Sequence, residues 1–257
     1  MANPVLTDKR FGIDGSDPSF GTRPMTTANT MSRGGVLGAL CFFGVFLILG
    51  AVFGWSTIST TPSTTGSIEI HGTNGLYLFG SMALAFVVAM IIAFKPKLAK
   101  TLGLVYALAE GFALGAISAV FNVVWPGIVL EAVGCTITTF VVITAAYGFG
   151  LIKVNNRVVR IISMATFGAL LFYLGAWVAS LVGFGNIFAL GGWAGIGISL
   201  VLCVIAAANL LSDFFFVDSA IAAGVEKDYN WYGAFGIMIT LIWLYLNVLR
   251  LLAMLRS

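Results

Sequence analysis

The sequence predicts an all-α membrane protein in which seven apolar helices form one bundle. Three observations lead to this fold class: apolar residues make up 60% of the 257 positions, charged residues make up only 9%, and the apolar residues come in long blocks. A soluble domain carries about 25% charged residues, whereas a helix that crosses a bilayer needs roughly 20 mostly apolar residues. The composition therefore indicates lipid, rather than water, as the solvent around the helices.

The apolar blocks follow one another through the chain and set the expected order of elements. Each is long enough to span the hydrocarbon core of a bilayer. The seven blocks are 35–55, 75–94, 101–124, 128–151, 161–182, 193–217 and 230–252. They leave too few residues for a separate soluble domain, so we expect one seven-span domain over residues 35–257.

Two polar segments lie outside these blocks. Residues 1–34 are rich in Gly, Ser, Thr, Pro and Asp and are expected to form a disordered cytoplasmic arm, because such a composition cannot bury a core. The link after the first block, STISTTPSTTGSIEIHGTNG, is rich in hydroxyl groups and contains the only histidine, His71. We expect it to be a polar external loop in which His71 is solvated.

Basic residues are distributed unevenly between the two sides of the predicted membrane. Eleven of the thirteen lysine and arginine residues lie in the N-terminal arm or in the links after the second, fourth and sixth blocks. The other three links contain neither residue. Because cytoplasmic loops are enriched in lysine and arginine, the N-terminus is expected to be cytoplasmic. Arg250 and Arg256 fall on the opposite side and are interpreted as side chains that extend to the interface.

Residue types that most enzymes require are scarce. Cys41, Cys135 and Cys203 occur singly within apolar blocks, so neither a metal-binding spacing nor a disulfide framework is visible. The sequence has no phosphate-binding glycine loop, nucleotide motif or Ser–His–Asp set. We therefore expect no enzyme activity, no cofactor and no resident metal. The net charge of +3 follows from the basic links and does not indicate a nucleic-acid partner.

Glu110 is an acid within the third apolar block, in the segment LVYALAEGFALGAISAVF. Its position is about 13 Å into the span at 1.5 Å per residue, near the middle of a hydrocarbon core about 30 Å thick. An acid at that depth costs on the order of 3 kcal/mol. Glu110 is therefore expected to face the bundle interior, where it either lines a polar path or is protonated and bonded to a neighbouring helix. Gly111 and Gly115 follow in G-x-x-x-G spacing, which permits close helix contact.

Asp213 and Asp218 lie near the cytoplasmic end of the sixth block. A spacing of five residues separates them by about 140° around a helix, so they cannot face the same point. Asp218 is nearer to the following link and is interpreted as the more solvated of the two. Glu131 lies within one turn of the external end of its block and is expected to reach water.

Three segments resemble the Bax inhibitor-1 family, also called transmembrane BAX inhibitor motif proteins. They are YALAEGFALGAIS, AAYGFGLIKVNNRVVRI, and the C-terminal run that contains KDYNWY and AFGIMITLIWLYLNVLRLLAML. The resemblance extends from about residue 31 to the C-terminus, and the order and spacing of the segments carry it, together with the span count and orientation. The long polar arm suggests a bacterial branch of the family.

The resemblance implies a seven-helix bundle with the last helix in the centre. It also implies a pH-sensitive calcium leak gated by two aspartates, one on the sixth span and one on the seventh. Asp213 and Asp218 each match a pattern for the first aspartate. Alternative alignments place Thr240, Ile239 or Asn247 at the second position, and none of these is acidic. The two-aspartate switch is therefore absent, although Thr240 or Asn247 is able to hydrogen-bond a carboxylate from the sixth span.

We expect an integral, multi-pass protein of the plasma (inner) membrane that acts as a calcium leak with pH sensitivity. Glu110, Asp213, Asp218, Thr240 and Asn247 offer only oxygen atoms as anionic or acceptor groups, which suits transient binding of a hard cation such as calcium. The alternative is a non-conducting regulator or scaffold that acts on other membrane proteins. An intramembrane protease is disfavoured because Asp213 and Asp218 lie on one helix and point apart.

Overall fold

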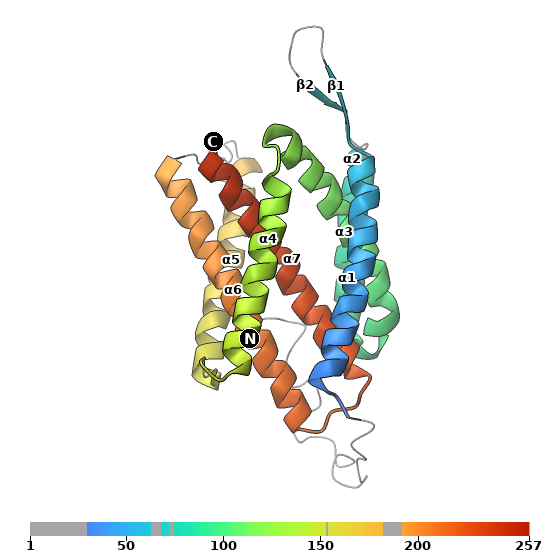
Figure 1. Cartoon of the computed structure of the whole chain (residues 1–257), viewed down its shortest axis with the longest axis vertical. Helices are drawn as coiled ribbons and strands as arrows, with labels where there is room; N and C mark the ends of the chain where they lie inside the picture. Colours follow the sequence, from blue (N-terminus) through green and yellow to red (C-terminus); the bar gives the residue numbers. More distant parts are fainter. Residues whose placement is uncertain (1–29, 63–67, 72–74, 153, 182–191, 257) are drawn as a thin grey trace.

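The computed structural model describes residues 30–62, 68–71, 75–152, 154–181 and 192–256. Within these ranges, seven helices are long and apolar enough to cross a membrane, so the predicted fold class is confirmed (Figure 1). The helices are α1 (Arg33–Ser56), α2 (Gly75–Phe94), α3 (Ala99–Val124), α4 (Ile128–Gly148), α5 (Asn156–Leu181), α6 (Gly192–Ala222) and α7 (Tyr229–Arg256). A short 3-10 helix, η4 (Pro96–Leu98), precedes α3.

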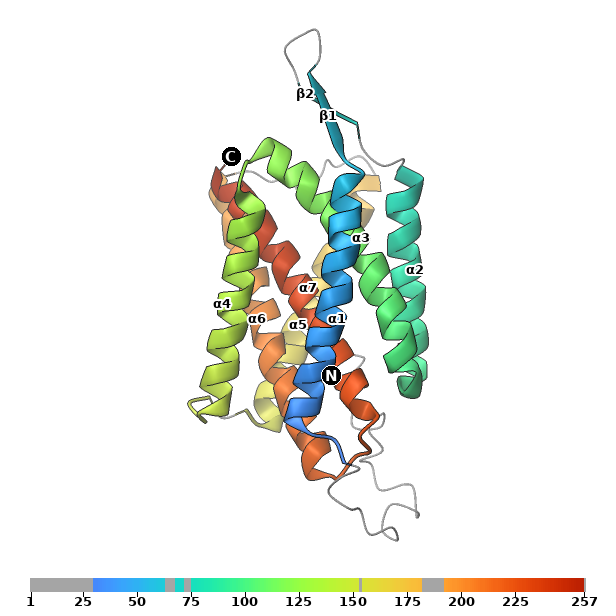
Figure 2. The ribbon, with the colours of Figure 1, turned by 45° about the vertical axis from the view of Figure 1, so that its right-hand side comes forward.

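The two ends of the bundle are distinguished by what they carry. The N-terminal end holds the start of α1 and the link between α6 and α7. A β-hairpin projects from the other end, called here the hairpin end (Figures 1 and 2). In the hairpin, β1 (Ser59–Pro62) pairs antiparallel with β2 (Ile68–His71), and Ser59 is opposite His71. The sequence predicted only a polar loop here. The β-branched Thr residues of β1 and Ile residues of β2 favour an extended backbone, but two four-residue strands give too short a pattern to recognise.

The predicted N-terminal arm lies mostly outside the described residues, which begin at Thr30. Its last residues are anchored to the link between α6 and α7. Thr30 forms an isolated antiparallel bridge with Glu226, and the backbone N–H of Met31 donates to the carbonyl of Val225 at 2.8 Å. Helix α1 begins directly afterwards, at Arg33.

Helix α7 crosses the bundle obliquely and is its central element (Figures 1 and 2). It packs against α1, α3, α4 and α6, and large side chains along its length, such as Tyr232, Phe235 and Leu244, are fully or almost fully buried. This arrangement gives α7 the central place that the resemblance implied. Side chains that reach α7 from the other helices therefore lie inside the protein.

Helices α1 and α3 are held together by glycines on both sides of their contact. A Cβ atom on any of four glycines would overlap a backbone carbonyl oxygen of the opposite helix. The four glycine–carbonyl pairs are Gly50 with Leu108, Gly54 with Phe112, Gly111 with Leu47, and Gly115 with Ala51. Since the backbones touch directly, this contact fixes the rotation of α3 and with it the direction in which Glu110 points.

Candidate functional site

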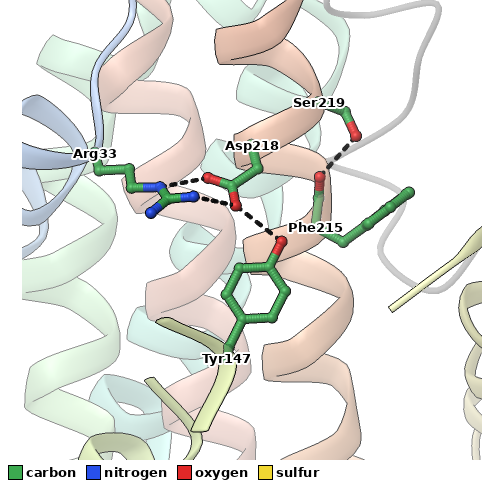
Figure 3. Close-up of polar contacts among 5 residues, drawn as sticks. All are labelled: Arg33, Tyr147, Phe215, Asp218 and Ser219. Carbon is green, nitrogen blue, oxygen red and sulfur yellow. Dashed lines mark hydrogen bonds and ion pairs between the residues drawn. The ribbon is translucent and has the colours of Figure 1, made fainter. Parts of the chain in front are cut away.

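Asp218 joins three helices at the N-terminal end of the bundle (Figure 3). Its Oδ1 accepts a hydrogen bond from Nε of Arg33 on α1 at 2.7 Å, and its Oδ2 accepts one from Nη2 of the same guanidinium at 2.7 Å. The hydroxyl of Tyr147 on α4 donates to Oδ2 at 2.9 Å. A bidentate arginine and a third donor restrict the carboxylate geometrically. We call Arg33, Tyr147 and Asp218 the Asp218 cluster.

Local backbone structure places Arg33 within reach of Asp218. Ser32 caps α1, because its Oγ accepts from the N–H of Gly35 at 3.1 Å. The N–H of Ser32 in turn donates to Oδ1 of Asn230 on α7 at 3.0 Å. The first turn of α1 is thus tied to the start of α7, and Arg33 extends from that turn towards α6.

Helix α6 extends beyond its predicted end, and this places Asp218 inside the helix. The N–H of Gly224 donates to the carbonyl of Ile221 at 3.0 Å, and that of Val225 donates to the carbonyl of Ala220 at 3.1 Å. These two bonds, with Gly224 at a φ of 71°, form a Schellman motif that ends the helix. Asp218 is the more exposed of the two aspartates, as interpreted from the sequence, but the helix continues past it and its carboxylate is bound.

A small cavity of about 100 Å³ adjoins the Asp218 cluster. Its lining includes all three cluster residues together with Val217 and Ile237. A cavity of this size has room for several water molecules. The side chain of Asp218 is 24% exposed and that of Arg33 is 67% exposed. Protons and small ions from the solvent at this end can therefore reach the carboxylate.

Asp213 is enclosed by the protein, whereas Asp218 is accessible to solvent. It is fully buried, and among the described residues it is the only charged side chain in the buried core. Ser212 and Asn209, on the same helix, are buried with it. The two aspartates are separated by about 140° around α6, as expected from their spacing. Asp213 therefore points into the protein, and Asp218 points towards α1 and α4.

Glu110 is half-buried on α3, between residues that contact α7. One turn before it, the ring of Tyr106 packs edge-on against Phe235 of α7 with centroids 5.0 Å apart. Two turns after it, Ser118 shares a hydrogen bond of 2.6 Å with the hydroxyl of Tyr245 of α7. Measured along the helices, Glu110 lies about 16 Å from the start of α3 and Asp213 about 13 Å from the end of α6. Glu110 therefore lies near the middle of α3, whereas Asp213 lies in the third of α6 nearest the N-terminal end of the bundle.

Thr240 and Asn247 are buried, but their hydrogen bonds do not reach the aspartates of α6. The hydroxyl of Thr240 donates to the carbonyl of Gly236 in its own helix at 3.3 Å. Oδ1 of Asn247 accepts from the hydroxyl of Tyr173 on α5 at 2.8 Å, and its Nδ2 donates to the carbonyl of Trp243 at 2.8 Å. The expected bond to a carboxylate of the sixth span was wrong, because nearer acceptors and a tyrosine donor already satisfy these groups.

The predicted site residues are therefore distributed through the bundle rather than gathered at one point. In the described part of the chain, no three His, Cys, Asp or Glu side chains come together as a metal-binding group would require. Glu131 pairs with Arg256 at 2.6 Å at the hairpin end. Arg33 and Tyr147 were missed as site residues: Arg33 counted only towards orientation, and Tyr147 only as part of a resembling segment.

A family model described as Bax inhibitor 1 like matches residues 3–257. The match covers nearly the whole chain. The protein belongs to this family. None of the curated proteins compared with the chain is significantly similar to it.

Membership in the Bax inhibitor 1 like family agrees with the seven apolar helices, and the protein is an integral, multi-pass membrane protein. In this Bax inhibitor 1 like chain both candidate aspartates come from α6. The positions on α7 that the resemblance compared with a second aspartate are occupied by Thr240, Asn247 or their neighbours. Asp218 is instead matched with a cation, Arg33, from α1.

Proposed function

We propose that this protein is a pH-sensitive cation leak for calcium that the Asp218 cluster holds closed. The observation that carries the proposal is the position of the cluster. It ties α1 and α4 to α6 at the N-terminal end, and it does so five residues from Asp213, the buried acid of the same helix. In this proposal the N-terminal end faces the cytoplasm, as the distribution of basic residues favours, and the membrane is the plasma membrane.

Breaking the Asp218 cluster opens the leak in this mechanism. The carboxylate holds Arg33 and accepts from Tyr147. When these bonds break, helix α6 is no longer tied to α1 and α4 at this end, and a cation from the adjoining cavity gains access towards Asp213 and Glu110. The family resemblance implies that pH modulates this flux, so flux is compared across a range of pH.

The first test is Asp218→Asn in proteoliposomes loaded with a calcium dye, between pH 6 and pH 8. The substitution removes the charge that holds Arg33, so flux should rise throughout this pH range. Arg33 is largely exposed, so the ion pair contributes at most about 1 kcal/mol, which corresponds to roughly a fivefold change. Glu226→Gln is the matched control, since Glu226 is 53% exposed at the same end and lies 4.0 Å from Lys97. An Asp218→Asn flux no faster than that of the wild type would refute this gate.

Glu110→Gln tests the path beyond the gate. Glu110 is half-buried near the middle of α3, and within the described residues its carboxylate makes no hydrogen bond or ion pair, so an entering cation would meet it directly. Replacing it with a neutral amide should reduce calcium flux severalfold at every pH in the same liposomes. Glu131→Gln, at the exposed hairpin end, should leave flux unchanged. Equal flux for Glu110→Gln and wild type at every pH would exclude Glu110 from the path.

The alternative function, a non-conducting regulator of other membrane proteins, is supported by the attachment of the N-terminal segment to the link between α6 and α7. A regulator that uses its arm to bind a partner should lose activity when residues 2–30 are deleted, while its bundle stays folded. Flux no faster than that of empty liposomes at all pH values would favour this function over the leak.

A further inference from the structure

A long groove lies on the side of the bundle between α1 and α4. Figure 2 shows these two helices standing apart, with α7 crossing between them. The groove has a volume of about 840 Å³. Its walls come from α1 between Leu40 and Ser56 and from α4 between Val129 and Phe140, and α7 with part of α3 forms its floor. Because it opens sideways within the membrane-spanning region, its surroundings are hydrocarbon rather than water.

The hydroxyl groups that line the groove are already satisfied. Ser56 and Thr136 each donate to a backbone carbonyl of their own helix, at 2.7 Å and 2.8 Å. Ser118 and Tyr245 share a hydrogen bond of 2.6 Å with each other. An ion or a polar head group would lose its hydration here and find no replacement, which is costly. The chemistry of the lining therefore selects an apolar occupant and separates this groove from any path for cations.

The length of the groove matches one leaflet of a bilayer. It starts at the hairpin end, where Ser56 is the last residue of α1 and Val129 is the second residue of α4. From there it extends about 24 Å along α1 and about 16 Å along α4, at 1.5 Å per residue. One leaflet contributes about 15 Å of hydrocarbon. The groove thus runs from the membrane surface to the bilayer centre or slightly beyond.

The size of the groove suits a hydrocarbon chain better than a transmembrane helix. A helix 10–12 Å in diameter and 24 Å long occupies roughly 1,900–2,700 Å³, whereas the groove has a volume of about 840 Å³, so a helix would place only one of its sides in it. A flexible hydrocarbon chain is narrow enough to lie within the groove along its length.

We propose that the groove is a binding site for one acyl chain of a membrane lipid from the leaflet at the hairpin end. Trp55 lies at its mouth and is 40% exposed, a position suited to the interface between chains and head groups. The bound chain fills the space between α1 and α4, which the Asp218 cluster connects only at their other ends. This site does not depend on whether the protein conducts cations.

The test uses the full-length protein in nanodiscs doped with a phosphatidylcholine that carries a diazirine in the middle of one acyl chain. After irradiation, mass spectrometry should find the label concentrated on groove residues of α1, α4 and α7. Gly44→Phe should lose this label, because Gly44 lines the groove and its added side chain enters open space. Gly38→Phe is the control: it lies on the same helix outside the groove, also with open space around it, and should keep the label.

Two results would overturn the site. One is a label that is spread evenly over the lipid-facing sides of α2 and α5, or that is unchanged in Gly44→Phe. Either outcome would mean that the label reports contact with the bulk bilayer only. The other uses Cys41, which lines the groove, as the single cysteine after Cys135→Ser and Cys203→Ser. Efficient cross-linking of Cys41 between two copies would assign the groove to a dimer contact. If Gly44→Phe fails to fold, the distribution of the label on the folded wild-type protein still tests the site.

Discussion

Gly115→Leu should produce the largest loss of stability of any single substitution considered for this protein. A Cβ atom at Gly115 overlaps the carbonyl oxygen of Ala51, and a backbone atom cannot move aside as the end of a side chain can. The substitution must therefore separate α1 from α3. Overpacking typically costs 1–3 kcal/mol, and we expect about 3 kcal/mol or more here because the obstacle is backbone. The melting temperature in detergent should fall by roughly 6 °C or more.

Gly80→Leu supplies the comparison for this experiment. Gly80 is a helical glycine in α2, and no atom lies within 4 Å of its Cβ position. Its substitution adds the same side chain within a transmembrane helix but creates no collision, so the melting temperature should remain close to that of the wild type. If both variants melted together, the loss would reflect the extra leucine itself and not the contact between α1 and α3.

Asp213→Asn should have the largest effect on transport. The substitution keeps the size and shape of the side chain and removes the only charge in the described buried core. A cation that passes through the bundle without a compensating charge bears a desolvation penalty of several kcal/mol. Each 1.4 kcal/mol of barrier corresponds to a tenfold change in rate, so calcium flux should fall at least about tenfold at the pH where wild-type flux is highest.

The two aspartates of α6 are thus predicted to respond with opposite signs. Asp213→Asn should reduce flux, whereas Asp218→Asn should raise it at neutral pH. Measuring both variants in one batch of proteoliposomes, with melting temperatures determined in parallel, separates transport from folding. If Asp213→Asn conducted as the wild type does while remaining folded, Asp213 would have no role in the path.

The seven spans could be predicted from the sequence because the requirement that sets them is local. A helix that crosses hydrocarbon needs an uninterrupted apolar length, and that length can be counted residue by residue. The predicted and observed elements differ mainly at their ends. Helix α6 continues from residue 217 to Ala222, since no helix-breaking residue occurs before Gly224, whose positive φ ends the helix.

The Asp218 cluster could not be predicted, because its geometry is not local. Arg33 and Asp218 are 185 positions apart, and Tyr147 and Asp218 are 71 apart. In the sequence, Asp218 is a single charge near the end of an apolar span, where a charge is normally solvated. Its partners depend on how α1 and α4 pack beside α6, which single-sequence periodicity does not contain. The hydrogen bonds of Asn247 were missed for the same reason, since Tyr173 lies on another helix.

The way in which the chain is attached just before α1 has a mechanical consequence. Three attachments, at Thr30, Met31 and Ser32, fasten the chain to the turn between α6 and α7 and to the start of α7 before it reaches Arg33. A force applied to the chain before Thr30 must break these attachments one after another before it acts on the guanidinium of Arg33. A molecule that grips the arm must therefore supply enough work to detach all three before it disturbs Asp218. The turn between α6 and α7 therefore protects the ion pair of Arg33 and Asp218 from forces that act on the N-terminal arm.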